Sequence, residues 1–155
     1  MAERIAGFYR VSPQISGLTE EVPLPRRATS GSAGYDFFAP YDIDLAPMET
    51  AVVPTGIRCR IDEGWFLMIA PRSGLGCKYR LSLDNTVGII DSDYYHSDNE
   101  GHIIIKMTNC TTEGKTIHIP AGTAFAQGIF LPYGITCDDD VTDMRNGGFG
   151  STTKG

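Results

Sequence analysis

Short β-type runs separated by glycine turn signals constrain the fold of this 155-residue sequence more than any other feature. In residues 57–61, apolar or thiol side chains alternate with arginines at a period of two, which predicts a strand with one buried face. Residues 65–70 are continuously apolar, which predicts a strand buried on both faces. Four further runs are typical of strands: residues 87–90, 102–107, 116–119 and 125–131.

The breaks between these runs follow a regular pattern. Glu-Gly pairs lie between two β-type runs at three places, where glycine supplies the positive φ that hairpin turns require: residues 63–64, 100–101 and 113–114. Three Pro-x-Gly triplets add further turns: residues 54–56, 120–122 and 132–134. Only residues 75–80 have room for a helix, of one or two turns. The sequence therefore predicts an all-β sandwich, jelly roll or barrel with one short helix.

Length and charge narrow the class of protein. A chain of 155 residues fits one domain, and its net charge of −6 argues against a nucleic-acid partner. A small polyanion still binds if arginines, backbone N–H groups or a divalent cation neutralise it locally. The four cysteines are widely spaced, so no zinc site is expected. Without a signal-peptide pattern or a long apolar run, we expect an intracellular, cytoplasmic protein that does not contact the membrane.

The segment 70–76, with the sequence APRSGLG, follows the apolar run and opens the short helix. Ser73 is a suitable N-cap, and the N–H groups of a helix N-terminus bind phosphate readily. Arg72 adds a possible charge-assisted bond to a phosphate oxygen. An ordinary capped turn with a surface arginine is the alternative interpretation, and the segment does not match a P-loop.

A second polar segment follows the run at 87–90. Asp91 comes directly after Ile90, so we expect a partly desolvated carboxylate at a strand end, which can act as a general base on water. Tyr94 has a ring suited to stacking on a flat ligand. The alternative is a simple acidic turn, because Asp-Ser-Asp is a frequent turn composition.

Single polar residues in apolar runs and an aromatic residue in the tail are the remaining candidates. Asp36 is the one carboxylate in an apolar run, so it must be paired or hydrogen-bonded, either in a structural role or near a cation. Gln127 is suited to satisfying a neighbouring backbone group. Phe149 stands alone in the glycine-rich tail, which favours stacking on a base, with Arg145 and Ser151 within reach of phosphate. A disordered C-terminus is the alternative.

Five segments, in this order, resemble the trimeric dUTPase family over nearly the whole chain: AGYDFFA (33–39), PRSGLG (71–76), NTVGIIDSDY (85–94), AGTAFAQGIF (121–130) and RNGGFGST (145–152). The resemblance implies a jelly-roll-like β-barrel over residues 1–144 and a flexible tail over 145–155 that closes the active site. It also implies a homotrimer in which each of three sites draws on all three chains. The reaction would convert dUTP to dUMP and pyrophosphate, which limits uracil in DNA and supplies dUMP for thymidylate synthesis.

The resemblance also implies a role for individual residues around the base and the reacting phosphate. Asp91 would activate the water that attacks the α-phosphorus. Tyr94 would pack under the deoxyribose and exclude a 2′-hydroxyl. The uracil edge would be read by Asn85 and by the backbone of Gly88, Ile89 and Ile90, with backbone near Ile104 on the other side.

The phosphate chain, the metal and the tail receive the other roles. Asp36 and Gln127 would orient waters on a Mg²⁺ ion that the triphosphate mainly holds. Phe149 would stack over uracil as the tail closes. The residues expected to hold the phosphates are Arg72, Ser73 and Gly74 on the barrel, with Arg145, Gly150 and Ser151 in the tail.

The sequence departs from the family pattern after Tyr94, where residues 95–100 precede Gly101. We expect this insertion to be an exposed polar surface that a regulatory protein partner could bind. Two alternatives to the dUTPase reaction follow. One is a regulatory protein that uses the dUTPase scaffold for binding, and the other is an enzyme of the dCTP deaminase type on the same fold.

Overall fold

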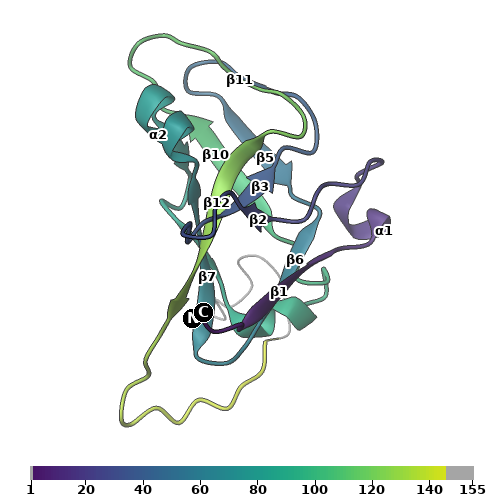
Figure 1. Ribbon diagram of the computed structural model, residues 1–155, viewed down its shortest axis with the longest axis vertical. Coiled ribbons are helices and arrows are strands. Elements are labelled where there is room, and N and C mark those ends of the chain that lie inside the picture. Colours follow the sequence, from purple (N-terminus) through teal and green to yellow (C-terminus); the bar gives the residue numbers. More distant parts are fainter. Residues whose placement is uncertain (1, 146–155) are drawn as a thin grey trace.

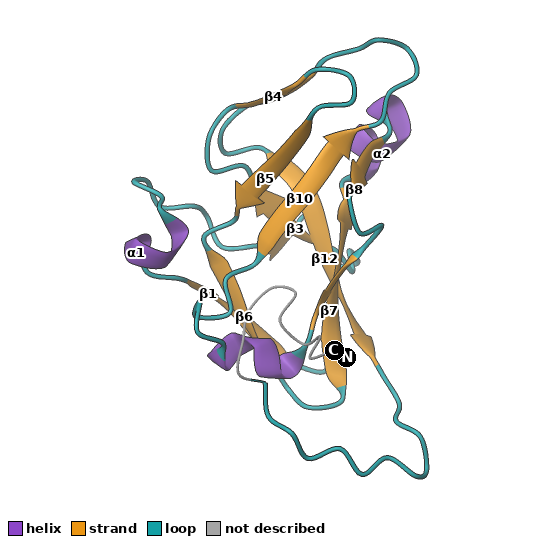
Figure 2. Cartoon of the chain, turned by 180° about the vertical axis from the view of Figure 1, so that it is seen from behind, coloured by secondary structure: helices purple, strands orange, loops and turns teal. Residues whose placement is uncertain are grey.

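The computed structural model describes residues 2–145, and Figures 1 and 2 show the chain from opposite sides. Strands dominate it, so the predicted all-β class is confirmed. The two short α-helices lie on opposite sides of the β-structure. In chain order the elements are β1 (Ala6–Arg10), α1 (Pro13–Ser16), β2 (Arg26–Arg27), β3 (Tyr35–Phe38), β4 (Ile43–Leu45), β5 (Thr50–Pro54), β6 (Ile57–Ile61), β7 (Trp65–Pro71), α2 (Ser73–Tyr79), β8 (Leu81–Leu83), β9 (Gly88–Ile90), the 3₁₀ helix η1 (Ser92–His96), β10 (Ile104–Asn109), β11 (Ile117–Ile119) and β12 (Ala124–Pro132).

The described strands pair in four antiparallel sheets, and their hydrogen bonds do not close one continuous barrel. The largest sheet has the order β2-β3-β12-β7-β9, and a second has the order β5-β10-β8. Two-stranded sheets join β1 to β6 and β11 to β4. This topology leaves β9 at an edge of the largest sheet, where its second side is available to a ligand.

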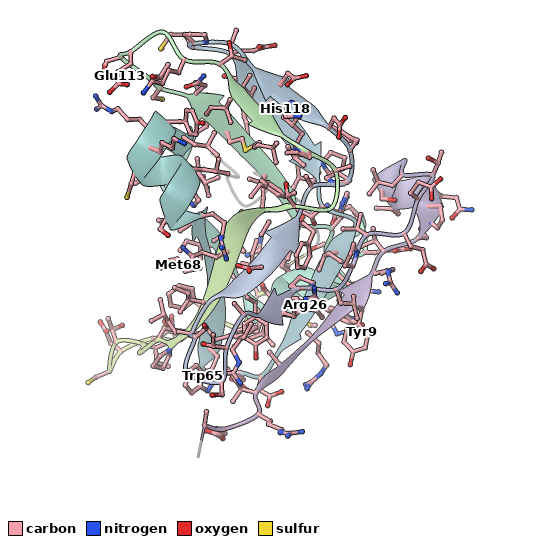
Figure 3. All side chains as sticks on the ribbon, turned by 45° about the horizontal axis from the view of Figure 1, so that its top comes forward. Tyr9, Arg26, Trp65, Met68, Glu113 and His118 are labelled. Carbon is pink, nitrogen blue, oxygen red and sulfur yellow. The ribbon has the colours of Figure 1, made fainter. Side chains whose placement is uncertain are left out.

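Side-chain alternation explains which face of each strand is buried. On β6, Ile57, Cys59 and Ile61 are buried, as the period of two predicted. On β7, Leu67 and Ile69 are buried, but Met68 and its same-face neighbours are only half-buried, so the prediction of a strand buried on both faces was wrong. Figure 3 shows Met68 near the outside of the molecule. One face of β7 thus remains apolar and partly accessible within the single chain.

The core lies between the sheets and holds the largest apolar side chains. Each such side chain contributes roughly 1.5–3 kcal/mol when it leaves water. The largest fully buried apolar side chains are Phe37, Phe125, Leu45, Ile57, Leu67, Ile69, Ile103, Met107, Ile117 and Val53.

The short helix predicted after β7 is α2, but its N-cap differs from the prediction. Arg72 occupies the cap position in an extended conformation, and its side chain makes no capping bond. The reason is that the Arg72 N–H donates to the carbonyl of Phe125, which keeps Arg72 in strand geometry. Ser73 is therefore the first helical residue, and its prediction as N-cap was wrong.

Gly64, Gly101 and Gly114 all have positive φ, as the Glu-Gly turn signals predicted. The strands on either side of each turn pair with other strands, so the expectation of hairpin turns was wrong. Beyond β12, residues 133–145 run away from the body of the molecule and then turn back toward it (Figure 1). Ile135 and Met144 in this segment expose 73% and 87% of their surface. Between residues 2 and 145, no helix has the length and apolar character needed to cross a membrane.

Candidate active site

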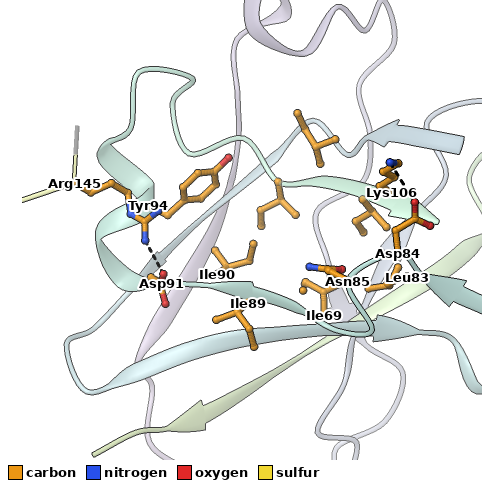
Figure 4. A pocket seen from close by; sticks show the side chains of 14 residues that line it. Ile69, Leu83, Asp84, Asn85, Ile89, Ile90, Asp91, Tyr94, Lys106 and Arg145 are labelled. Atoms are coloured by element: carbon orange, nitrogen blue, oxygen red, sulfur yellow. Dashed lines mark hydrogen bonds and ion pairs between the residues drawn. The ribbon is translucent and has the colours of Figure 1, made fainter. Parts of the chain in front are cut away.

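A pocket of about 460 Å³ lies beside β9 and β10 (Figure 4). It brings together the residues predicted to bind the base and sugar, the predicted general base and the predicted first residue of the tail. These predicted residues are Asn85, Gly88, Ile89, Ile90, Asp91, Tyr94, Ile104 and Arg145. Asp91, Tyr94 and Arg145 lie at one end of the pocket, and Asp84 and Lys106 lie at the other.

Two strand edges border this pocket. β9 pairs with β7 from Leu67 to Ile69 and has no strand partner on its other side among the described residues. β10 pairs with β8 only from Met107 onward, so Ile104 reaches the pocket beyond the end of β8. A Cβ on Gly88 would lie 3.0 Å from the Cβ of Ile69, so glycine allows β9 to approach β7 closely. Backbone N–H and C=O groups of an edge strand can therefore face a ligand here.

Asp91 follows β9 directly and carries a carboxylate at the mouth of the pocket. Its Oδ2 lies 2.6 Å from Nη2 of Arg145, whose Nε lies 2.9 Å from Oδ1 of Asp93. The Asp91 side chain is nevertheless 51% exposed. The carboxylate is therefore only about half removed from solvent in the single chain, because it lies past the end of an edge strand.

Tyr94 is buried, and hydrogen bonds hold its hydroxyl in place. The hydroxyl donates to the carbonyl oxygen of His102 at 2.6 Å, and Nδ2 of Asn99 donates to the hydroxyl at 2.9 Å. His102 is buried too, and its Nε2 accepts the Gly56 N–H at 3.0 Å. Burial lowers the pKa of His102, while the nearby Glu100 carboxylate opposes this shift. His102 is therefore a structural residue that keeps the wall behind Tyr94 in place.

A second group of predicted residues lies outside the pocket. Gln127 of β12 pairs with Asp36 of β3 on one side and with Ala70 of β7 on the other. Nη1 of Arg72 donates to Oδ1 of Asp36, and Nε2 of Gln127 donates to the carbonyl of Pro71 at 3.1 Å. The Asp36 pairing and the Gln127 bond to the backbone agree with the sequence interpretation. Ser73 and Gly74 follow in α2, so we call these five residues the Arg72 group.

The insertion at residues 95–100 differs from its prediction as an exposed polar surface. Ser97 is buried, Tyr95, Asn99 and Glu100 are half-buried, and only His96 and Asp98 are exposed. Packing against β6 explains this difference, because Arg58 of that strand donates to the carbonyl of Tyr95 at 2.6 Å. Most of the insertion is therefore part of the folded body.

Several residues that line the pocket were not predicted from the sequence. Ile69 and Leu83 belong to neighbouring strands, and no local pattern shows that they meet β9. Lys106 and Asp84 pair across the pocket end, with Nζ and Oδ2 3.3 Å apart. A single lysine within the strand-like run at 102–107 was the available signal for an outward-facing charge. The predicted tail residues Phe149, Gly150 and Ser151 lie outside the described residues.

A pocket that borders an unpaired strand edge, with a carboxylate at one end and a separate arginine group nearby in the chain, suits an enzyme that hydrolyses a nucleotide. A dUTPase family model matches residues 20–153 of this chain. The deoxyuridine 5'-triphosphate nucleotidohydrolase of Escherichia coli O9:H4 (strain HS) is 43% identical over 143 residues, which cover 87% of this chain and 90% of that protein.

Solved structures agree with this match. The dUTPase from Streptococcus mutans superposes with a TM-score of 0.70 and 34% identity, covering 84% of this chain and 98% of that one. A dUTPase from phage phi11 of S. aureus, described with a structural Mg(II) ion, shares the fold with a TM-score of 0.68 at 22% identity, covering 90% of this chain and 98% of that one.

The chain therefore belongs to the dUTPase family, as the five sequence segments predicted. It is an enzyme that hydrolyses dUTP to dUMP and pyrophosphate. The alternative of a dCTP deaminase finds no support in these matches.

Proposed function

We propose that the pocket beside β9 binds the deoxyuridine part of dUTP, and that the unpaired edge of β9 reads the uracil. The observation that carries this assignment is the position of Gly88, Ile89 and Ile90 at a sheet edge that lines the pocket. Uracil presents one N–H donor between two carbonyl acceptors, which a backbone C=O and N–H can match. Cytosine presents the opposite pattern at two of these positions, so the same edge leaves unpaired groups and rejects it.

Asp91 acts as the general base on this proposal. Its carboxylate accepts a proton from a water molecule as the water oxygen bonds to the α-phosphorus. The bond from that phosphorus to the bridging oxygen breaks, and pyrophosphate leaves with the electron pair. A base at a strand end is fixed by the sheet, which favours the alignment that phosphoryl transfer requires.

Arg145 and the Arg72 group would bind the phosphate chain. Arg145 already lies beside Asp91 and Asp93, so its guanidinium would exchange a carboxylate partner for a phosphate oxygen when substrate arrives. Arg72 offers a second guanidinium that is 39% exposed. A protein with a net charge of −6 needs such local positive charge to accept a triphosphate.

Mg²⁺ is the proposed metal. Asp36 and Gln127 carry oxygen atoms, which are the ligands that Mg²⁺ prefers. The Asp36 carboxylate is already paired with Arg72, and one such carboxylate does not enclose an ion. Elsewhere in residues 2–145, no three His, Cys, Asp or Glu side chains gather at one place. These residues therefore fit an ion that the triphosphate itself holds, with Asp36 and Gln127 orienting its waters. When bound, the ion would neutralise phosphate charge.

The proposed assembly is a homotrimer. The Arg72 group does not line the pocket of its own chain, and Asp91 is half-exposed, so a second copy would complete the site. Neighbouring copies would also cover the apolar face of β7 and the exposed side chains of Ile135 and Met144. In this assembly, residues 1–144 form the domain and residues 145–155 the tail that closes over substrate.

A regulatory partner at residues 95–100 has less support than the sequence suggested. Of these residues only His96 and Asp98 are exposed. If the insertion serves a partner alone, a double alanine variant at these two positions should weaken binding of that partner and keep hydrolysis unchanged.

The reaction and the proposed base are tested with a panel of nucleotides. Purified protein is incubated with dUTP, dCTP, dTTP and UTP in Mg²⁺, and pyrophosphate and ammonia are followed. We expect pyrophosphate from dUTP alone, with the rate lost in Asp91→Asn. Full activity of Asp91→Asn would remove Asp91 as the base, and ammonia from dCTP would point to the deaminase reaction.

A further inference from the structure

The insertion at residues 95–100 contacts the proposed active site through one side chain. Nδ2 of Asn99 donates a hydrogen bond to the Tyr94 hydroxyl at 2.9 Å, and that hydroxyl donates to the carbonyl of His102 at 2.6 Å. The hydroxyl thus uses its one proton and one lone pair on two fixed partners. A ring held at its far end in this way has little freedom to move out of the pocket wall.

Asn99 is itself held firmly by the turn around it. Its Oδ1 accepts the N–H of Gly101 at 3.2 Å, and its backbone carbonyl accepts the N–H of His102 at 3.1 Å. A Cβ on Gly101 would lie 2.7 Å from the carbonyl oxygen of Tyr94, and φ at Gly101 is +69°. Only glycine therefore allows the turn to close this tightly over the residue that it positions.

Two further contacts fix the insertion to the rest of the fold. The Arg58 guanidinium lies over the ring of Tyr95, 3.6 Å from its centroid, and donates to the carbonyl of the same residue. The Glu100 carboxylate accepts the N–H of Ser12 at 2.8 Å, and this bond lowers the pKa of Glu100. The insertion is thus anchored at both ends, and Asn99 transmits that rigidity to Tyr94.

We propose that Asn99 is a positioning residue that sets the selectivity for deoxyribose by fixing the Tyr94 ring. This inference rests on the proposed binding of deoxyuridine in the pocket that Tyr94 lines, with Tyr94 beneath the sugar as the family resemblance implies. A fixed ring occupies the space that a 2′-hydroxyl needs, whereas a ring free to retreat admits it. The uracil edge is read by β9, which Asn99 does not contact, so base selectivity should not depend on Asn99.

The test compares kcat/KM for dUTP, UTP and dCTP in the wild-type protein and in Asn99→Ala. We expect the dUTP to UTP preference to fall about three- to tenfold, the value of one neutral hydrogen bond, while the dUTP to dCTP preference stays unchanged. Asn99→Asp is the second variant, because it keeps the acceptor for Gly101 and replaces the amide donor to Tyr94 with a carboxylate oxygen that can only accept. Asp98→Ala is the matched control, since this neighbour is exposed, and it should change neither preference.

A double-mutant comparison with Tyr94 shows whether Asn99 acts by positioning Tyr94 or only by stabilising the loop. In a Tyr94→Phe background, which lacks the hydroxyl, Asn99→Ala should have no further effect on the dUTP to UTP preference. An equal loss of kcat/KM for all nucleotides, or full additivity with Tyr94→Phe, would overturn the inference.

The Tyr94→Ala variant tests the placement of Tyr94 beside the sugar separately from the positioning role of Asn99. If Tyr94→Ala lowers the sugar preference and both Asn99 variants leave it unchanged, the positioning role is wrong and the site assignment stands. If Tyr94→Ala also leaves the preference unchanged, Tyr94 does not contact the sugar, and both proposals fall.

Discussion

The pocket beside β9 and the Arg72 group differ in how completely one chain builds them. The pocket is formed by two strand edges, and a network of hydrogen bonds fixes Tyr94 in its wall. The Arg72 group joins side chains from β3 and β12 to the start of α2 through an ion pair and a hydrogen bond to the backbone, outside the pocket beside β9. The pocket beside β9 is thus built within one chain, whereas the Arg72 group lies outside it.

This difference suggests a division of tasks between copies of the chain. On the proposed function, recognition of the base would depend on backbone positions that the pairing of β9 with β7 sets. Phosphate binding would depend on guanidinium groups that ion pairs hold before substrate arrives. The Arg72–Asp36 and Arg145–Asp91 pairs both offer a guanidinium to phosphate, one from each region.

The largest expected effect is on the pocket side, at Asp91. Asp91→Asn should lower kcat for dUTP by about 10²- to 10⁴-fold, the range for a general base, with little change in substrate affinity. Asp93→Asn is the matched control, because Asp93 shares the Arg145 guanidinium but has no assigned chemical role. A similar loss of kcat in both variants, measured by pyrophosphate release, would show that holding Arg145 matters more than the base.

On the phosphate side, Arg72→Ala should lower kcat/KM for dUTP about 10- to 100-fold, because a charge-assisted hydrogen bond is worth roughly 1.5–3 kcal/mol. Binding of deoxyuridine, which has no phosphate, should not change when measured by calorimetry. Arg60→Ala removes another surface arginine that is paired with an aspartate, Asp62, and should leave both quantities unchanged. Weaker deoxyuridine binding in Arg72→Ala would show that Arg72 also affects the nucleoside site, so the two regions would not act separately.

The rigidity of the pocket wall is tested at Gly101. Gly114→Ala places an alanine at the same φ of +69° in open space and should cost about 1–2 kcal/mol of stability. Gly101→Ala adds a clash with the Tyr94 carbonyl and should cost about 1–3 kcal/mol more. Denaturant unfolding of both variants gives the comparison, and equal costs would mean that the turn is not tightly packed.

The smallest effect is the pH dependence of stability. Burial lowers the pKa of His102 from 6.5, so the unfolded chain takes up the proton more readily and stability falls as the pH drops through 6.5. The bond to Asp44 raises the pKa of the exposed His118, so its contribution is present below 6.5 and is lost as the pH rises through the folded-state pKa. The free energy of unfolding is measured at pH 7.5 and at pH 5.5. Its decrease between these two pH values should be smaller in His102→Gln, and larger in His118→Gln, than in the wild-type protein.

Local sequence patterns predicted the parts of the fold that local physics determines. The alternation in β6, the apolar run of β7 and the positive φ at the Glu-Gly turns are properties of neighbouring residues, and the structure bears out their position. The cap of α2 was missed because a long-range bond from Arg72 to Phe125 decides it.

The arrangement of the site was only partly accessible from sequence. That Gln127 lies opposite Asp36, and Gly88 opposite Ile69, depends on which strands pair, and no local pattern encodes that choice. The packing of residues 95–100 likewise depends on Arg58 and Ser12, far away in the chain. Motif resemblance identified the candidate residues, but their division into two regions required the structure.

A site shared between copies is tested most directly by complementation. Asp91→Asn and Arg72→Ala chains are each purified, measured for dUTP hydrolysis, and then unfolded and refolded together in equal amounts. If the pocket of one copy uses the Arg72 group of another, random mixing restores about one quarter of the sites, because each needs two intact partners. Recovery of about 25% of wild-type activity is the predicted result. Activity no higher than the average of the two separate variants would show that each chain builds its site alone, and would contradict the account.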